Sequence, residues 1–254
     1  MQNSISYLLR YGILPLLLII FSIGPINLTV SGQTGPAIPG DQLKNQSINS
    51  VDTNSVIARL QIALAIYESF PDSAKNIATE AFRHSAQLGF QLGMARSCII
   101  LGRISQNDGQ FDSATYLFTK GLISAKKANL TTASFYINIA NNYFFRGAYQ
   151  QAMENYLSAL QSSPRKNTSG DSCQVYLNIA LIWTRLGAFE QANHYLDIVQ
   201  PIAYRTRDTA MQVSLLTSRA DILMAENKNP EAIKLFRKSL RLATATNLPG
   251  PALE

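Results

Sequence analysis

A six-residue pattern occurs three times in this chain: a glycine, any residue, an aromatic residue, two polar residues and an alanine. The three copies are residues 109–114, 147–152 and 187–192. Their alanines belong to a series of five, which is Ala74, Ala114, Ala152, Ala192 and Ala232. Because successive alanines are 40, 38, 40 and 40 residues apart, the sequence predicts five stacked repeats of about 40 residues each.

Each repeat is predicted to be a pair of antiparallel helices. Apolar residues recur at every third or fourth position, as in Tyr136, Ile139, Ala140 and Tyr143, which is helical and not strand periodicity. The expected helix pairs are 54–68 with 72–88, 92–107 with 111–128, 132–146 with 149–163, 172–186 with 189–204, and 210–226 with 230–246. The predicted fold is therefore all-α, a right-handed α-solenoid of five such pairs with the start of a sixth.

Small residues are expected where the two helices of a repeat cross. Twelve residues before the last four alanines of the series, the chain has Gly102, Ala140, Ala180 and Ala220. Four residues after the same alanines, it has Phe118, Tyr156, Leu196 and Phe236. We expect the small residues to let the two backbones approach, and the large residues to fill the groove beside the crossing.

Two further periodic positions are predicted to end the helices. In three repeats a glycine stands between the two helices, where the end of the first helix requires a residue with positive φ. The end of each second helix is expected at Gly89, Asn129, Asn167, Arg207 and Asn247. All but Arg207 are residue types that tolerate a left-handed cap. Pro201 is expected to bend its helix or to end it early.

The third repeat resembles the tetratricopeptide repeat (TPR). The residues that carry the resemblance are 136–143, Gly147, Tyr149, Ala152, Tyr156, Ala159 and Pro164. The resemblance covers residues 54–254, with units at about 54–90, 91–130, 131–168, 169–208 and 209–248. The period of about 40 residues exceeds the usual 34, and such long repeats are similar to those in the extracytoplasmic regions of sensor histidine kinases and LuxR-type regulators of Bacteroidota.

The amino terminus predicts export. Arg10 precedes an apolar stretch at 11–23, the arrangement of a signal peptide, with cleavage expected after Gly32. An uncleaved membrane anchor is the alternative, because the uncharged stretch continues to Val30. Residues 33–53 are expected to be a disordered linker. Both readings of residues 1–32 place the repeats outside the cytoplasm, periplasmic or secreted.

No pattern in the sequence predicts catalysis, a cofactor or a metal. Cys98 and Cys173 are expected to be buried free thiols, because their positions lie two repeats apart. His84 and His194 have no second ligand at metal-binding spacing. Basic residues interleaved with aromatic ones are absent, so nucleic-acid binding is not expected at a net charge of +6.

Tetratricopeptide repeats bind partners in a concave groove lined chiefly by their first helices. The resemblance places eight residues on that face: Arg96, Arg103, Asn138, Asn141, Phe145, Asn178, Arg185 and Asp221. Asparagine side chains can hold the backbone of an extended peptide, and arginines can pair a carboxylate. The positions equivalent to the basic residues of carboxylate-clamp repeats hold Ile137, Ser214 and Ser218, which departs from that subfamily.

The sequence therefore favours a non-catalytic module that binds a protein or an extended peptide. We expect the extracytoplasmic sensory or dimerisation region of a signalling protein, and the alternative is a stand-alone periplasmic or surface scaffold. Residues 249–254 are interpreted as the opening of a sixth first helix, so the array is expected to be truncated there. Ile233, Phe236 and Leu240 are then expected to leave apolar surface exposed, which permits self-association through that end.

Overall fold

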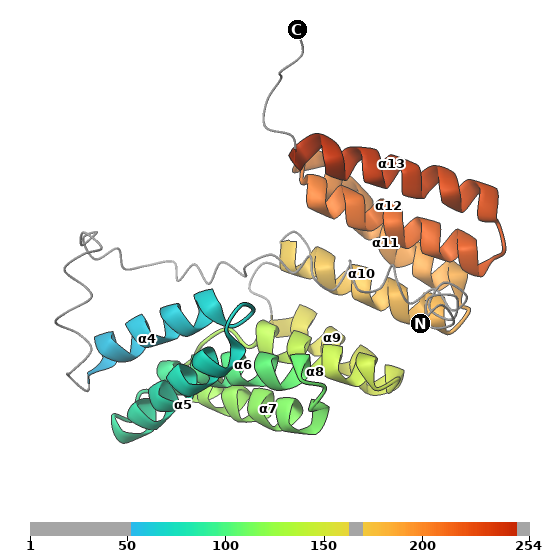
Figure 1. Cartoon of the computed structure of the whole chain (residues 1–254). Coiled ribbons are helices and arrows are strands. Elements are labelled where there is room, and N and C mark those ends of the chain that lie inside the picture. Colours follow the sequence, from blue (N-terminus) through green and yellow to red (C-terminus); the bar gives the residue numbers. More distant parts are fainter. Residues whose placement is uncertain (1–51, 163–169, 248–254) are drawn as a thin grey trace, which may run out of the picture. The chain divides into compact units, whose positions relative to one another are not determined.

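The computed structural model describes residues 52–162 and 170–247, and within them it contains ten helices and no strand (Figure 1). The helices are α4 (Thr53–Ile66), α5 (Pro71–Gln87), α6 (Gln91–Asn107), α7 (Phe111–Lys127), α8 (Ala133–Phe145), α9 (Tyr149–Ser162), α10 (Gly170–Arg185), α11 (Phe189–Arg205), α12 (Thr209–Ala225) and α13 (Asn229–Asn247). Each begins and ends within two residues of its predicted range. The all-α solenoid of antiparallel helix pairs is confirmed.

Several predictions concern residues outside those that the structure describes. They are the signal peptide or anchor at 1–32, the linker up to residue 51, the cap at Asn167 and the start of a sixth repeat at 249–254. Among the helices of residues 52–162 and 170–247, none is long and apolar enough to span a bilayer.

The described residues form two compact units, one ending at Ile198 and the other beginning at Val199. In the first unit, each helix from α4 to α9 packs against the next along the chain, and α9 packs against α10. The first helices of neighbouring repeats also touch, because α6 contacts both α4 and α8. This arrangement places α4, α6 and α8 side by side, as expected for the face that lines a groove.

The core of the first unit is made where second helices meet the first helix of the next repeat. Phe118 on α7 is fully buried and packs with Phe135 and Ile139 of α8. Tyr156 on α9 has the same place in the next repeat and packs with Val175 and Ile179 of α10. Burial of such large side chains stabilises each repeat through its neighbour, which is how a repeat too short to fold alone becomes stable.

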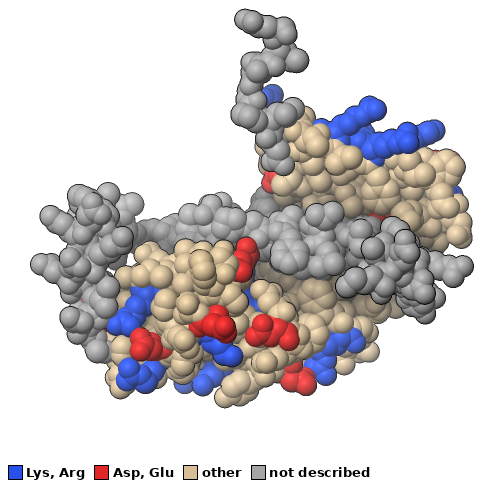
Figure 2. Space-filling model, viewed as in Figure 1, with Lys and Arg blue, Asp and Glu red and all other residues tan. Residues whose placement is uncertain are grey.

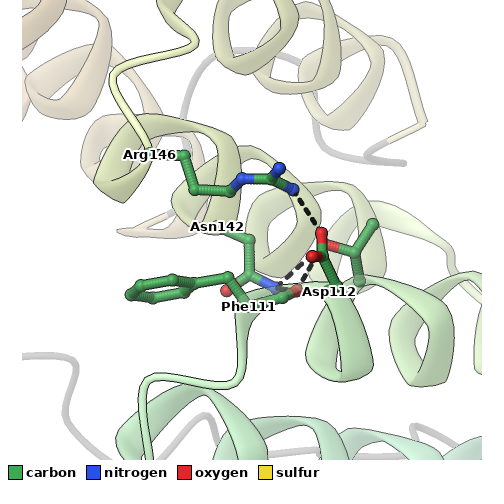
Figure 3. Close-up of polar contacts among 5 residues, drawn as sticks. Phe111, Asp112, Asn142 and Arg146 are labelled. Carbon is green, nitrogen blue, oxygen red and sulfur yellow. Dashed lines mark hydrogen bonds and ion pairs between the residues drawn. The ribbon is translucent and has the colours of Figure 1, made fainter.

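A polar contact joins α7 to α8 at the same junction (Figure 3). Asn142 is fully buried, and its Nδ2 donates to the Phe111 carbonyl oxygen at 3.3 Å and to Thr115 Oγ1 at 3.2 Å. Beside it, Arg146 Nη1 lies 2.7 Å from Asp112 Oδ1. Because Asn142 bonds the first turn of α7, it fixes the position of α8 along α7.

In the second unit, polar side chains hold α12 between its neighbours. Gln212 Nε2 donates to the Ala203 carbonyl oxygen of α11 at 3.1 Å. Arg219 Nη2 donates to Gln200 Oε1 of α11 at 2.8 Å. On the other side, the hydroxyl groups of Thr217 and Ser239 on α13 lie 3.0 Å apart.

The predicted left-handed positions are confirmed at six residues, whereas Asn247, which was also expected to end its helix in this way, is the last residue of α13 and does not have positive φ. The first-helix ends Gly109, Gly147 and Gly187 have φ of 72°, 72° and 74°. The second-helix ends Gly89, Asn129 and Arg207 have φ of 64°, 53° and 53°. In the last repeat Asn227 stands in place of the glycine between the two helices, and it has φ of 62°. The second to fifth repeats therefore share this backbone geometry even where the residue type differs, whereas Ser69 at the equivalent position of the first repeat does not have positive φ.

Replacing Arg207 by glycine is expected to stabilise the protein by roughly 0.5–1 kcal/mol, because an arginine strains the left-handed conformation that glycine adopts freely. The measurement is the urea midpoint followed by circular dichroism. The matched control is Arg205→Gly, since Arg205 is the last residue of α11 and a glycine there is expected to destabilise. A lower midpoint for Arg207→Gly would contradict the prediction.

Pro201 does not end its helix early. The helix α11 continues beyond it to Arg205, so that part of the expectation was wrong. A proline removes only one backbone donor and one hydrogen bond, and the buried side chains of Val199, Ile202 and Ala203 on either side of it keep the helix packed.

Cys98 and Cys173 are buried thiols that form no disulfide within the described part of the chain, in agreement with the prediction. Burial raises the pKa of the Cys98 thiol to about 11, against the smaller opposing effect of Lys120. A thiol with that pKa is almost entirely protonated at neutral pH, so Cys98 is a packing residue without nucleophilic character.

Candidate functional site

The structure joins two of the predicted groove residues in one hydrogen-bonded cluster. Asn178 Nδ2 on α10 donates to Asn141 Oδ1 on α8 at 3.4 Å. One turn earlier on α10, Gln174 Nε2 donates to Asn178 Oδ1 at 3.1 Å, because residues four apart share a helix face. The three side chains form a row of amides, which we call the amide cluster, across the first helices of the third and fourth repeats.

The hydroxyl group of a buried tyrosine also bonds to the amide cluster. Tyr156 is 1% exposed, and its hydroxyl donates to Asn141 Oδ1 at 2.5 Å. Burial raises the pKa of Tyr156, and the neighbouring Asn178 side chain partly opposes that shift. The hydroxyl is therefore a permanent donor at physiological pH, and it holds the Asn141 amide in one orientation.

The Nδ2 group of Asn141 is available as a hydrogen-bond donor. Its Oδ1 accepts two hydrogen bonds, from Tyr156 and Asn178, while its Nδ2 donates to no group within the described part of the chain. Asn141 is only partly buried. An oriented amide nitrogen at a partly exposed surface can donate to the carbonyl oxygen of a bound peptide.

Asn138 differs from the other two asparagines. It is 5% exposed, and its Nδ2 donates to the Ser134 carbonyl oxygen one turn earlier at 2.7 Å. Because Ser134 is also on α8, this hydrogen bond occupies the Asn138 Nδ2 group within its own helix. Of the three predicted asparagines, Asn141 and Asn178 are thus the two that belong to the amide cluster.

The two predicted arginines of α6 have different surroundings. Arg96 is half-buried, and burial lowers its pKa, yet within residues 52–162 and 170–247 it makes no ion pair. Arg103 lies at the end of α4, beside Tyr67. Burial and the hydrogen bond to Glu68 raise the pKa of Tyr67, and the charge of Arg103 opposes them. Neither arginine therefore makes an ion pair among the described residues, and Arg103 is the one that interacts with Tyr67.

The remaining predicted residues do not join the amide cluster. Phe145 is 38% exposed and stacks on Phe111, with ring centroids 5.9 Å apart. Arg185 is exposed in the last turn of α10. Asp221 lies on α12, in the unit that begins at Val199. A single groove lined by all eight residues therefore remains a prediction.

Sequence reasoning did not assign Gln174, Tyr156 or Asn142 to polar contacts. Tyr156 was read only as a packing residue. Asn142 carries a sequence signal, because the equivalent positions of the second, fourth and fifth repeats are Ile104, Ile182 and Ile222. An asparagine in a buried isoleucine series predicts a hydrogen bond to a neighbouring helix.

Within the described residues, no three histidine, cysteine, aspartate or glutamate side chains gather as metal ligands. Amides and a guanidinium group are instead suited to recognising peptide backbone and carboxylate groups.

Comparison with known proteins agrees with this architecture. The tetratricopeptide repeat family model matches residues 133–166, which span α8 and α9. No curated protein matches the sequence significantly.

Solved structures share the fold at low sequence identity. The crystal structure of BtubC (BKLC) from P. vanneervenii is similar with a TM-score of 0.60 and 15% identity, over 79% of this chain and 94% of that one. The TPR-like repeats of a putative kinesin light chain from Podosopora anserina have a TM-score of 0.61 and 16% identity, over 76% of this chain and 96% of that one. The apo form of RapI has a TM-score of 0.62 and 12% identity, over 81% of this chain and 90% of that one. The chain thus matches the tetratricopeptide repeat model at residues 133–166 and shares the fold of these solved repeat structures.

Proposed function

We propose that this protein is a non-catalytic module that binds an extended segment of a partner protein across its first helices, at the amide cluster. The observation that carries the proposal is the orientation of Asn141, whose oxygen is held by Tyr156 and Asn178 while its nitrogen remains available. Tetratricopeptide repeat proteins are in general scaffolds that bind protein or peptide partners, which supports the same class of function.

The chemistry of the amide cluster favours backbone recognition. An extended peptide exposes carbonyl oxygens and amide hydrogens that no internal hydrogen bond uses. Asn141 Nδ2 can donate to such a carbonyl oxygen, and side-chain amides bind backbone without regard to the neighbouring side chains. Arg96, with no ion pair in the described part of the chain, adds a position for a carboxylate. The favoured ligand is an extended segment with at least one acidic side chain.

The finer proposal is that this module is the extracytoplasmic sensory or dimerisation region of a signalling protein. Its support is the apolar amino-terminal stretch after Arg10 and the resemblance to the repeats of sensor kinases. A stand-alone extracytoplasmic scaffold is the competing form of the same proposal. Protease treatment of intact cells tests the shared location, since repeats outside the cytoplasm are cleaved and cytoplasmic ones are protected. The coding sequence after residue 254 separates the two forms, because only the first requires an output module.

The binding site is tested with peptides selected on the purified protein from a random library of unstructured segments. We expect Asn141→Ala combined with Asn178→Ala to weaken the selected peptides about tenfold, since each hydrogen bond contributes roughly 0.5–1.5 kcal/mol. The measurement is fluorescence anisotropy with labelled peptides.

Asn76→Ala is the matched control, because Asn76 is an exposed asparagine on the second helix α5. Circular dichroism of each variant confirms that the helices are retained. Equal affinities for the double variant, the control and the natural protein would place the peptide elsewhere and contradict the proposal.

A further inference from the structure

The outer surface of α13 exposes apolar side chains. Ile233 is 49% exposed and Leu240 is 64% exposed, while Phe236 between them is half-buried. Residues 233 and 240 are seven apart, so they lie on the same side of the helix over two turns. A neighbouring side of α13 is packed on α12, where Ser239 Oγ bonds to Thr217 and to the Val213 carbonyl oxygen.

Four cations lie next to this apolar stripe. They are Lys234, Arg237, Lys238 and Arg241, and all four are exposed. None of them makes an ion pair within residues 52–162 and 170–247. Lysine and arginine side chains gather on the outer surface of α13 in Figure 2. We call these six residues, the four cations with Ile233 and Leu240, the basic apolar face of α13.

The repeats themselves show what kind of partner fits such a face. Leu122 of α7 has the same place in its repeat as Leu240, eight residues after the alanine of the series. Leu122 is 8% exposed because it packs in one cluster with Phe135 and Ile139 of α8. A second helix of this array therefore accepts another helix that presents large apolar residues four positions apart.

The charge of the face restricts the partner further. The positions equivalent to the four cations are Tyr116, Thr119, Lys120 and Ile123 on α7, so the corresponding surface of α7 carries one positive charge where α13 carries four. Four unpaired cations attract acidic side chains beside the apolar contact. A second copy of the same face would instead place cations opposite cations.

We propose that the basic apolar face of α13 docks an acidic amphipathic helix of a partner protein. The docked helix presents large apolar side chains at positions i and i+4 to Ile233 and Leu240. Glutamate or aspartate residues along its edge meet Lys234, Arg237, Lys238 and Arg241. This surface is separate from the amide cluster and does not depend on it. An anionic membrane is less favoured, because only two large side chains of the face are exposed for insertion.

The experiment uses the purified protein and a synthetic helix of about 18 residues, stapled because short helices are marginal in water. The probe carries phenylalanine and isoleucine at i and i+4 and glutamates along one edge. A second probe has lysines in place of the glutamates. We expect the acidic probe to bind at least about tenfold more tightly, and the preference to shrink as salt is raised.

Lys238→Glu combined with Arg241→Glu is expected to abolish the preference for the acidic probe. Lys75→Glu combined with Lys127→Glu is the matched control, with the same change of charge on the exposed surfaces of α5 and α7. Equal binding of both probes, or equal binding by both double variants, would overturn the proposal. Binding to phosphatidylserine-containing vesicles without binding to the acidic probe would replace it with a membrane surface. Self-association that Leu240→Glu abolishes, without probe binding, would replace it with a homodimer.

Discussion

Replacing Phe118 by alanine is expected to lower the free energy of unfolding by about 3–5 kcal/mol. Phe118 is fully buried between its own helix pair and the next repeat, where Phe135 and Ile139 contact the same cluster. Removing the ring leaves a cavity between two repeats that the surrounding helices cannot fill by small shifts. Urea unfolding followed by circular dichroism measures the loss.

The control for this substitution is Tyr116→Ala. Tyr116 is an aromatic residue two positions earlier on α7, and it is 64% exposed. Its replacement is expected to change the stability by no more than about 0.5 kcal/mol. Similar losses for the two variants would mean that α7 does not hold the repeats together through its buried face.

Replacing Gly102 by alanine is expected to destabilise the protein by roughly 1–3 kcal/mol, although alanine is the better helix former. A Cβ at Gly102 would lie 2.5 Å from Cε1 of Phe118, and a ring inside the core cannot move away without disturbing its neighbours. Urea unfolding of Gly102→Ala alone measures this cost.

The cause is tested by a double-mutant cycle with Phe118→Ala. In that background the clash is absent, so Gly102→Ala is expected to be neutral or to stabilise by up to about 1 kcal/mol. Gly121→Ala is the control, because a Cβ there would meet Phe135 and Cys98 at 2.5 and 2.8 Å and remains unfavourable without Phe118. An equal cost of Gly102→Ala in both backgrounds would contradict the clash.

The helices of this protein could be predicted from the sequence almost in full. Helical periodicity is local, because each turn is closed by hydrogen bonds between residues four apart, and apolar spacing reports it directly. The end positions were equally accessible, since a left-handed residue favours glycine or asparagine and so leaves a residue-type signal. Arg207 has positive φ despite its side chain, because its place in the repeat imposes that conformation.

For the candidate site, the sequence predicted some of the residues but not their contacts. Asn141 and Asn178 were named from the repeat pattern, but their contact depends on how α8 and α10 face each other. The surroundings of Asn138 could not be predicted either. It was placed on the same helix face as the other two asparagines, yet its side chain is buried and bonds to the backbone of its own helix. Spacing along a chain assigns a residue to a helix face, whereas side-chain pairing depends on the rotation and separation of two packed helices.

The sequence by itself determined that this chain is an array of helix pairs, where each pair begins and ends, and which small and large residues meet at the crossings. Those properties arise from contacts close in sequence and repeated at a constant period. Only the tertiary structure decided that Tyr156 orients Asn141, that Asn142 joins α7 to α8, and that Phe236, expected to be exposed together with Ile233 and Leu240, is half-buried. The physical reason is that hydrogen bonds and burial between helices depend on distances of a few ångströms, which a periodic pattern does not specify.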